Sequence, residues 1–211
     1  MNKQDNINNN INKDEINNTI KKCIILCNGP SVVLFNQFKQ GKNLDDYDFI
    51  TVNKWDTIYR KLEIKKPPKH VIVGKKALRH NITNILRYKD TTTFHGAISY
   101  RSKKNYKLLR FGPTKCYNKT INFTSPLKWT GVYAIQLALK LEYDEIHIFG
   151  FTGTNAPCAW DRERRKPIQK SNLNKIYSFF DELDNKKILQ EKIRFYENKD
   201  NHPLSKYIYY K

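Results

Sequence analysis

Hydrophobic positions along the chain gather in short runs that are separated by polar turns containing glycine or proline. Cys23–Cys27 and Phe49–Val52 are apolar or β-branched without alternation, which is typical of strands buried on both faces of a parallel sheet. The same reasoning predicts further strands with turn residues beside them. These lie at His70–Val73, Thr91–Tyr100, Ile146–Phe149 and Ile193–Tyr196.

Helical spacing of apolar residues occurs between these predicted strands. The clearest case starts at Thr130, where Val132, Ile135 and Ala138 fall on one face. Other helices are predicted to begin near Val32, Lys75, Trp55 and Asn172. The alternation predicts an α/β fold, a Rossmann-like and mostly parallel sheet with helices on both faces in a single domain.

The stretch from Thr130 to Phe151 reads as turn, buried helix and buried strand, which is half of a βαβ unit. Such a unit places the helix N-terminus and the carboxyl end of the strand at one edge of the sheet. We therefore expect Thr130, Gly131, Gly150 and Phe151 to lie close together beside a ligand crevice.

A second candidate for this edge is the turn Asn28-Gly29-Pro30-Ser31, which directly follows the first predicted strand. Gly29 permits close backbone approach, Pro30 suits a first helical position, and the free N–H groups of a helix start attract anions. The turn is interpreted as a phosphate or nucleotide cradle, and the alternative is a tight connection without a ligand.

Polar residues flank the second predicted strand at both ends. Asp46 and Asp48 form a D-x-D pattern, but they precede the strand and are therefore expected as solvated residues at the far edge of the sheet. Asn53 follows the strand, where its amide could donate to and accept from a ligand. The alternative for Asn53 is a cap on the helix that begins near Trp55.

The 211 residues carry 39 Lys or Arg and 20 Asp or Glu, a net charge of +19. This excess of positive charge favours partners that carry negative charge, such as phosphates or nucleic acid, or peripheral contact with anionic membrane or glycan. Cys23 and Cys27 are expected as buried thiols, and no second Cys or His cluster completes a metal site. With neither a signal sequence nor a membrane-spanning run, a cytoplasmic location is expected.

The predicted domain organisation has three parts, and the second of them contains a candidate lid. A low-complexity tail at 1–22 is expected to be disordered, and a Rossmann-like domain is expected to span 23–197. Within it, the polar stretch 152–171 is a candidate lid. Residues 198–211 form a C-terminal tail.

Three segments together resemble the sialyltransferases. C-I-I-L-C-N-G-P-S at Cys23–Ser31 and D-F-I-T-V-N at Asp48–Asn53 resemble the large sialylmotif of the animal enzymes. The stretch Thr130–Phe151 resembles the small sialylmotif, and N-G-P-S and T-G-V-Y-A-I are also similar to the Campylobacter-type bacterial enzymes.

The resemblance implies a variant of the GT-A fold that transfers a sugar from a CMP-sugar donor to a glycan acceptor, with inversion and without a metal or other cofactor. Asn28, Gly29 and Ser31, with Pro30 between them, would contact the nucleotide phosphate and ribose. Asn53 would also reach the nucleotide. Thr130, Gly131 and the nearby Phe151 would line the phosphate or the sugar carboxylate.

The chain differs from the family in the catalytic base that deprotonates the acceptor hydroxyl. The family uses a His near the start of the helix after the lid, and residues 170–175 contain none. A His near its ordinary pKa suits that step, and His202 in His202-Pro203-Leu204 is the candidate. The alternatives are a pterin or nucleotide diphosphokinase of similar fold, a catalytically inactive nucleotide-sugar binder, and a nucleic-acid-binding module.

Overall fold

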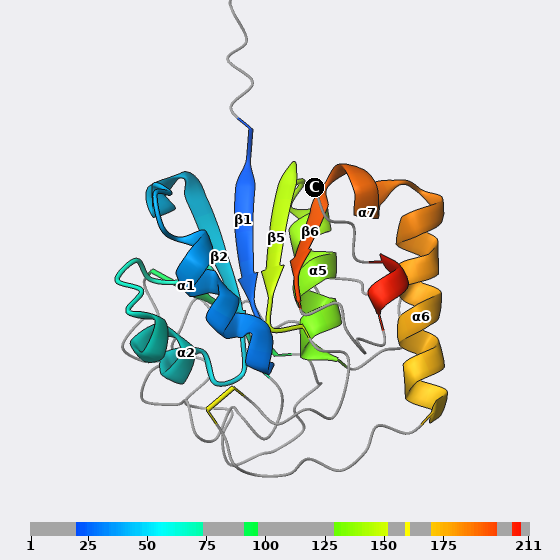
Figure 1. Ribbon diagram of the computed structural model, residues 1–211, viewed down its shortest axis with the longest axis horizontal. Coiled ribbons are helices and arrows are strands. Elements are labelled where there is room, and N and C mark those ends of the chain that lie inside the picture. Colours follow the sequence, from blue (N-terminus) through cyan, green and yellow to red (C-terminus); the bar gives the residue numbers. More distant parts are fainter. Residues whose placement is uncertain are drawn as a thin grey trace, which may run out of the picture.

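A six-stranded parallel sheet forms the centre of the protein (Figure 1). The computed structural model describes residues 20–73, 91–96, 129–151, 159–160, 170–197 and 204–207. Each hydrogen-bonded pair of strands runs parallel, in the order β4-β3-β2-β1-β5-β6. The strands are β1 (Lys22–Leu26), β2 (Tyr47–Val52), β3 (His70–Val73), β4 (Thr93–Gly96), β5 (Glu145–Phe149) and β6 (Ile193–Tyr196). The predicted Rossmann-like α/β fold is confirmed.

The strand order reverses once, between β1 and β5. The chain moves from β1 through β2 and β3 to β4 on one side, and then returns to β5 and β6 on the other. Because parallel crossovers are right-handed, the connecting helices of the two halves lie on opposite faces. Such a reversal opens a crevice at the carboxyl ends of the two central strands, which is where this architecture binds ligands.

Helices cover both faces of the sheet, with α1 and α2 on one side and α5 and α6 on the other (Figure 1). The first face carries η1 (Pro30–Leu34), α1 (Phe35–Phe38) and α2 (Trp55–Leu62). The second carries α5 (Thr130–Lys140) and α6 (Lys170–Asn185). The remaining short elements are η2 (Leu44–Asp46), α7 (Ile188–Glu191) and η3 (Ser205–Tyr207).

The apolar run that forms β1 and ends at Cys27 contributes side chains to the hydrophobic clusters on both faces of the sheet. Cys23, Ile25 and Cys27 pack in the cluster beneath α5, whereas Ile24 and Leu26 pack in the cluster beneath α1 and α2. Every β1 residue from Cys23 to Leu26 is fully buried. The absence of alternation in the sequence is thus explained by burial on both faces.

Several boundaries differ from the prediction. The first helix is only a 3-10 turn followed by one α-helical turn, and α6 begins at Lys170, so the last residues of the predicted lid are helical. Leu204 and Tyr207, assigned to the tail, are buried, and the Tyr207 hydroxyl donates to Asp181 Oδ1 at 2.6 Å. The packed part of the chain therefore continues past residue 197.

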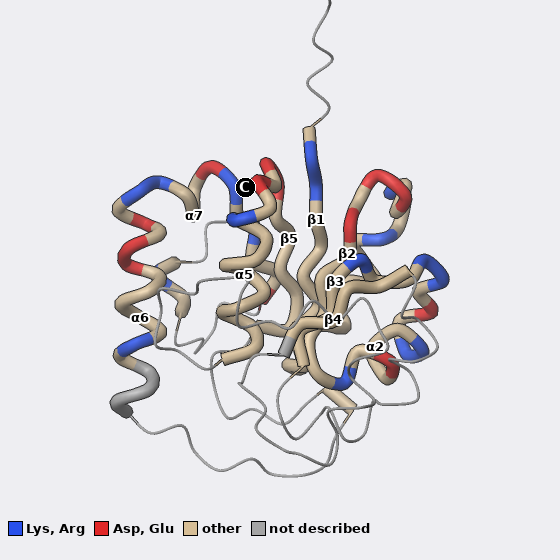
Figure 2. The backbone as a smooth tube through the Cα atoms, turned by 180° about the vertical axis from the view of Figure 1, so that it is seen from behind, with Lys and Arg blue, Asp and Glu red and all other residues tan. Residues whose placement is uncertain are grey.

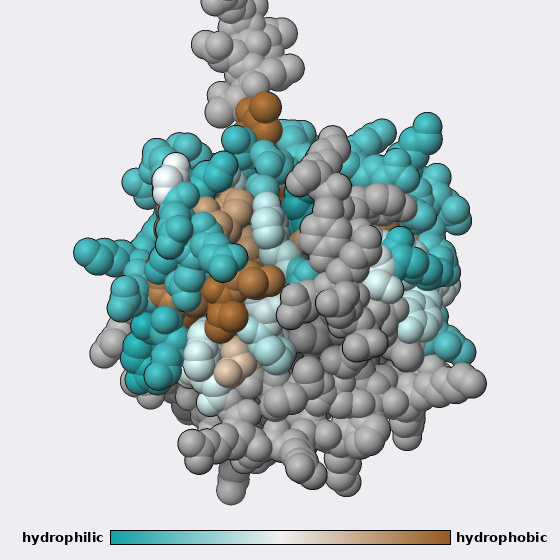
Figure 3. All heavy atoms as spheres, viewed as in Figure 1, coloured by the Kyte–Doolittle hydropathy of each residue, from teal (hydrophilic) through white to brown (hydrophobic). Residues whose placement is uncertain are grey.

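The described surface is mostly hydrophilic, with hydrophobic atoms gathered over η1 and α1 (Figure 3). Val33, on η1, has 44% of its surface exposed. Basic and acidic residues are interspersed along α2 and α6 (Figure 2). In the described part of the chain, no helix combines the length and the apolar character that crossing a membrane requires.

Candidate nucleotide-binding site

The turn after β1 is held against the end of β5 by backbone hydrogen bonds. The Cys27 N–H donates to the Phe149 carbonyl and the Gly29 N–H to the Gly150 carbonyl, both at 2.8 Å. Pro30 opens η1 immediately afterwards, as predicted. The sequence Asn28–Ser31 therefore lies at the reversal point of the sheet, where a crevice is expected.

The N-terminus of α5 reaches the same place. Its N-cap residue, Trp129, has no side chain that can accept from the first turn, and Thr130 is the first helical residue. The backbone ladder begins with the Tyr133 N–H, which donates to the Trp129 carbonyl at 3.0 Å. The N–H groups of Thr130, Gly131 and Val132 have no partner within the helix, as at any helix start, and such groups favour an anion.

Asn53 joins the turn after β2 to the start of α5. Its side-chain Nδ2 donates to Thr130 Oγ1 at 2.9 Å, and its backbone N–H donates to the Ile72 carbonyl at 2.8 Å. The residue has a left-handed backbone with φ of 49°, which asparagine tolerates well. The N-cap position of α2 is Lys54, one residue after Asn53.

Gly131 and Phe151 complete the convergence of the predicted residues. A Cβ added at Gly131 would lie 2.6 Å from Phe151 Cε2 and 3.5 Å from Cys27 Sγ. Phe151 itself is only 4% exposed, so its ring supports the helix start from the core side. Glycine at this position lets α5 approach the ends of β1 and β5.

The candidate lid contacts the site through its described residues. The Ala159 N–H donates to the Asn28 carbonyl at 2.9 Å, and the neighbouring Trp160 is 36% exposed. Residues 152–158 and 161–169 lie outside the described residues. The described part of the segment thus lies against the turn that the sequence singled out.

Gly131→Ala is expected to lower the melting temperature, although alanine favours helices by about 1 kcal/mol over glycine. The new methyl group would overlap the Phe151 ring, and overpacking of a core typically costs about 1 to 3 kcal/mol. Thermal unfolding checks this. The double variant Gly131→Ala/Phe151→Leu should recover part of the loss, and an unchanged or higher melting temperature for Gly131→Ala alone would contradict the close approach.

Glu197 is a site residue that the sequence analysis missed. It directly follows β6, is 4% exposed, accepts from the backbone N–H groups of Phe151 and Gly150, and lies near the Ser31 hydroxyl. Burial raises the pKa of its carboxyl to about 7, and those hydrogen bonds only partly oppose the rise. Its position after a strand beside β5 was the available signal, by the same rule that selected Asn53.

The raised pKa of Glu197 predicts a pH-dependent stability. The folded protein holds the Glu197 proton more tightly than the unfolded chain, so this residue makes unfolding easier as pH rises from 4.5 to about 7. Relative to wild type, Glu197→Gln should gain about 3 kcal/mol over that interval. Urea unfolding at pH 4.5 and 7.5 measures the gain. Exposed Glu191→Gln is the control, and equal pH dependence of both variants would refute the burial effect.

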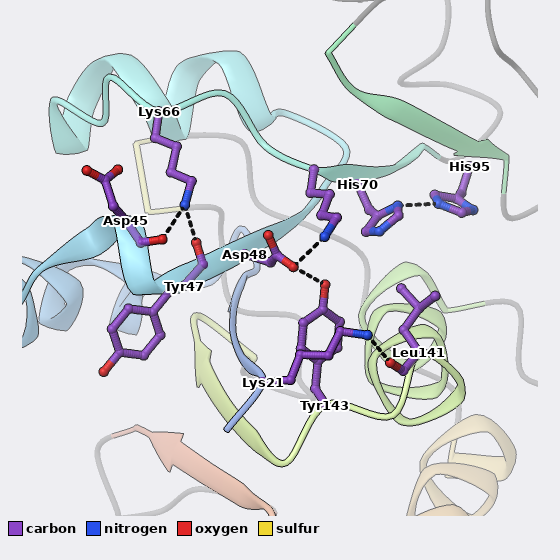
Figure 4. Close-up of polar contacts among 10 residues, drawn as sticks. Lys21, Asp45, Tyr47, Asp48, Lys66, His70, His95, Leu141 and Tyr143 are labelled. Atoms are coloured by element: carbon purple, nitrogen blue, oxygen red, sulfur yellow. Dashed lines mark hydrogen bonds and ion pairs between the residues drawn. The ribbon is translucent and has the colours of Figure 1, made fainter. Parts of the chain in front are cut away.

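Asp46 and Asp48 lie at the opposite end of the sheet, since Asp48 pairs with Cys23 near the start of β1. Figure 4 shows Asp48 with its hydrogen-bond partners. Asp46 is exposed, as predicted, but Asp48 is not merely solvated. Its Oδ2 accepts from the Tyr143 hydroxyl at 2.6 Å and from Lys69 Nζ at 2.7 Å. Burial alone would raise the Asp48 pKa, but these hydrogen bonds outweigh it and the pKa is lowered. Asp48 is therefore part of a structural cluster away from the crevice.

The described histidines do not supply a base at the crevice. His70 Nδ1 lies 3.0 Å from His95 Nε2, and burial lowers the pKa values to about 4 and about 3 (Figure 4). His147, inside β5, packs against Phe38 and contacts the Tyr196 hydroxyl at 3.0 Å, as expected for a packing residue. His202, the candidate base, lies outside the described residues.

The protein has a doubly wound α/β fold, in which the turns after β1, β2 and β5 and the start of α5 meet at the carboxyl edge of the sheet. Within the described ranges, no group of three or more His, Cys, Asp or Glu could hold a metal. Cys23 and Cys27 are buried free thiols with pKa values raised by burial, as predicted for inert cysteines.

A scan against protein-family models gives no match, and a search of curated proteins also gives none.

Proposed function

We propose that the protein is a metal-independent inverting glycosyltransferase. It would transfer a sialic or related ulosonic acid from a CMP-activated donor to a glycan acceptor. One observation carries the proposal: the Asn53 side chain hydrogen bonds to Thr130, next to the Asn28–Ser31 turn. The three segments that resemble sialylmotifs therefore meet at one rim of the sheet.

The chemistry of the rim suits a departing nucleotide monophosphate. CMP leaves with a single phosphate, and its growing charge can be stabilised by oriented N–H groups without a cation. The first turn of α5 and the turn around Gly29 supply such groups. Asn28, Ser31 and Asn53 add amide and hydroxyl donors for the phosphate or the ribose.

The remaining catalytic requirement is a base for the acceptor hydroxyl. The resemblance and the H-P-L sequence make His202 the candidate. Glycan acceptors present hydroxyl groups that an imidazole near neutral pKa can deprotonate as the bond forms. His202→Ala should abolish transfer but leave CMP binding intact.

Thermal unfolding with added nucleotides tests the donor assignment. A ligand that binds the folded state raises its melting temperature, so CMP is expected to give a shift that UMP, GDP and ATP do not match, with or without Mg²⁺. A shift only with ATP and Mg²⁺ would instead indicate a diphosphokinase. Salt-sensitive binding of nucleic acid without any response to CMP would indicate a nucleic-acid-binding module.

A further inference from the structure

The Glu197 carboxylate connects the turns that follow β1 and β5. Ser31 belongs to the first turn and lies near the carboxylate, whereas Gly150 and Phe151 belong to the second turn and donate their backbone N–H groups to it. The Gly29 N–H also donates to the Gly150 carbonyl, so both the N–H and the C=O of Gly150 are hydrogen bonded. Glu197 therefore lies within the site but is too buried, at 4% exposed, to be a surface contact.

Ser31 has one hydroxyl proton, which it can donate either to the Glu197 carboxylate or to a phosphate oxygen of a bound ligand. An ionised Glu197 can only accept, so the Ser31 hydroxyl can bond to it only by donating its proton to the carboxylate. A protonated Glu197 can donate to Ser31 Oγ, which leaves the hydroxyl proton for a phosphate oxygen. The Ser31 oxygen is buried and makes no short hydrogen bond with another described residue, so its contact with Glu197 is loose and can be exchanged.

We propose that Glu197 is a positioning residue of the nucleotide site, and that it takes up one proton from solvent when an anionic phosphate binds beside Ser31. This inference rests on the proposed function, because it needs a phosphate at this rim. An anion that enters the site disfavours a second negative charge nearby and so raises the carboxyl pKa further. Phosphate binding and protonation of Glu197 then favour each other.

The surroundings of Glu197 permit this proton uptake at neutral pH. Its carboxyl pKa of about 7 leaves it partly ionised before the ligand binds. The titratable group that faces it from β1 is the Cys27 thiol, whose pKa is raised by burial and then by Glu197 itself. That thiol stays neutral, so the charge change on binding belongs to the carboxyl group.

Calorimetric titration of the full chain with CMP tests the coupling. At pH 7.5, measurements in two buffers of different ionisation enthalpy give the number of protons exchanged, and CMP itself is then almost fully ionised. The wild-type protein should take up a substantial fraction of one proton, and Glu197→Gln should take up none. Between pH 7 and 8 the wild-type affinity should fall by up to about tenfold, whereas the variant should lose little. Glu191→Gln on α7 is the matched control and should behave as wild type.

The outcomes separate this inference from the proposed function. If CMP binds but Glu197→Gln takes up as many protons as wild type, the inference is wrong and the nucleotide site stands. If CMP binds to neither protein, both fail. If Glu197→Gln does not fold, ¹³C NMR of the wild-type carboxyl groups decides: the Glu197 pKa should rise on addition of CMP, and an unchanged value would overturn the proposal.

Discussion

Gly150→Ala should destabilise the protein more than any other single methyl addition considered for the site. Gly150 has φ of +72°, a left-handed conformation that costs an L-residue about 1 to 2 kcal/mol. The new Cβ would also lie 2.6 Å from the Cys27 carbonyl oxygen and 2.9 Å from Val32 Cβ. Because the first of these is backbone, the turn itself must shift, at an overpacking cost of about 1 to 3 kcal/mol.

Gly41→Ala is the matched control for backbone strain. Gly41 has nearly the same φ, +70°, but no described residue beyond its two chain neighbours comes within 4 Å of an added Cβ. Urea unfolding of both variants separates strain from close packing. Gly41→Ala should lose only the strain energy, whereas Gly150→Ala should lose about twice as much or fail to fold. Equal losses would show that the turns after β1 and β5 are not tightly joined.

Asn53→Gly should weaken CMP binding by about 10- to 100-fold, which corresponds to about 1.5 to 3 kcal/mol for a hydrogen bond to a charged group. The glycine removes the side-chain amide while keeping the left-handed backbone unstrained. It also releases the Thr130 hydroxyl from its 2.9 Å contact. Calorimetric titration with CMP measures the loss.

A control for the loss of an asparagine side chain is available at the other end of the sheet. Asn43 accepts from the Asp45 N–H at 3.2 Å and donates to Asp46 at 3.1 Å, as the cap of η2. Asn43→Ala should lower stability by about 1 kcal/mol and leave the CMP affinity unchanged. If Asn43→Ala weakens CMP binding as much as Asn53→Gly does, Asn53 has no specific role at the rim.

Much of the site follows from the order of predicted elements alone. Apolar runs without alternation identify buried parallel strands, and residues that come after such strands share one edge of the sheet. Asn28, Asn53 and Phe151 follow strands, and Thr130 begins a helix, so the sequence predicts that they meet. The contacts of Asn53 with Thr130 and of Phe151 with Gly131 confirm that proximity.

The remainder depends on contacts that hydrophobic spacing does not record. Asp48 was expected in solvent, but Tyr143 and Lys69 bond to it from segments distant in sequence. Glu197 looks like an ordinary acid after a short strand. Only the three-dimensional arrangement shows that two neighbouring turns bury it, because burial is set by chain segments that arrive from elsewhere.

The central claim is that one rim of the sheet binds the phosphate of CMP. Two-dimensional ¹⁵N NMR during titration with CMP tests it most directly, since each amide reports its own surroundings. The largest shifts should occur at the backbone N–H groups of Gly29, Ser31, Thr130 and Gly131, and at the side-chain amide of Asn53. Saturable shifts confined to the opposite edge, near Asp48 and Lys69, or no shifts with millimolar CMP, would contradict the account.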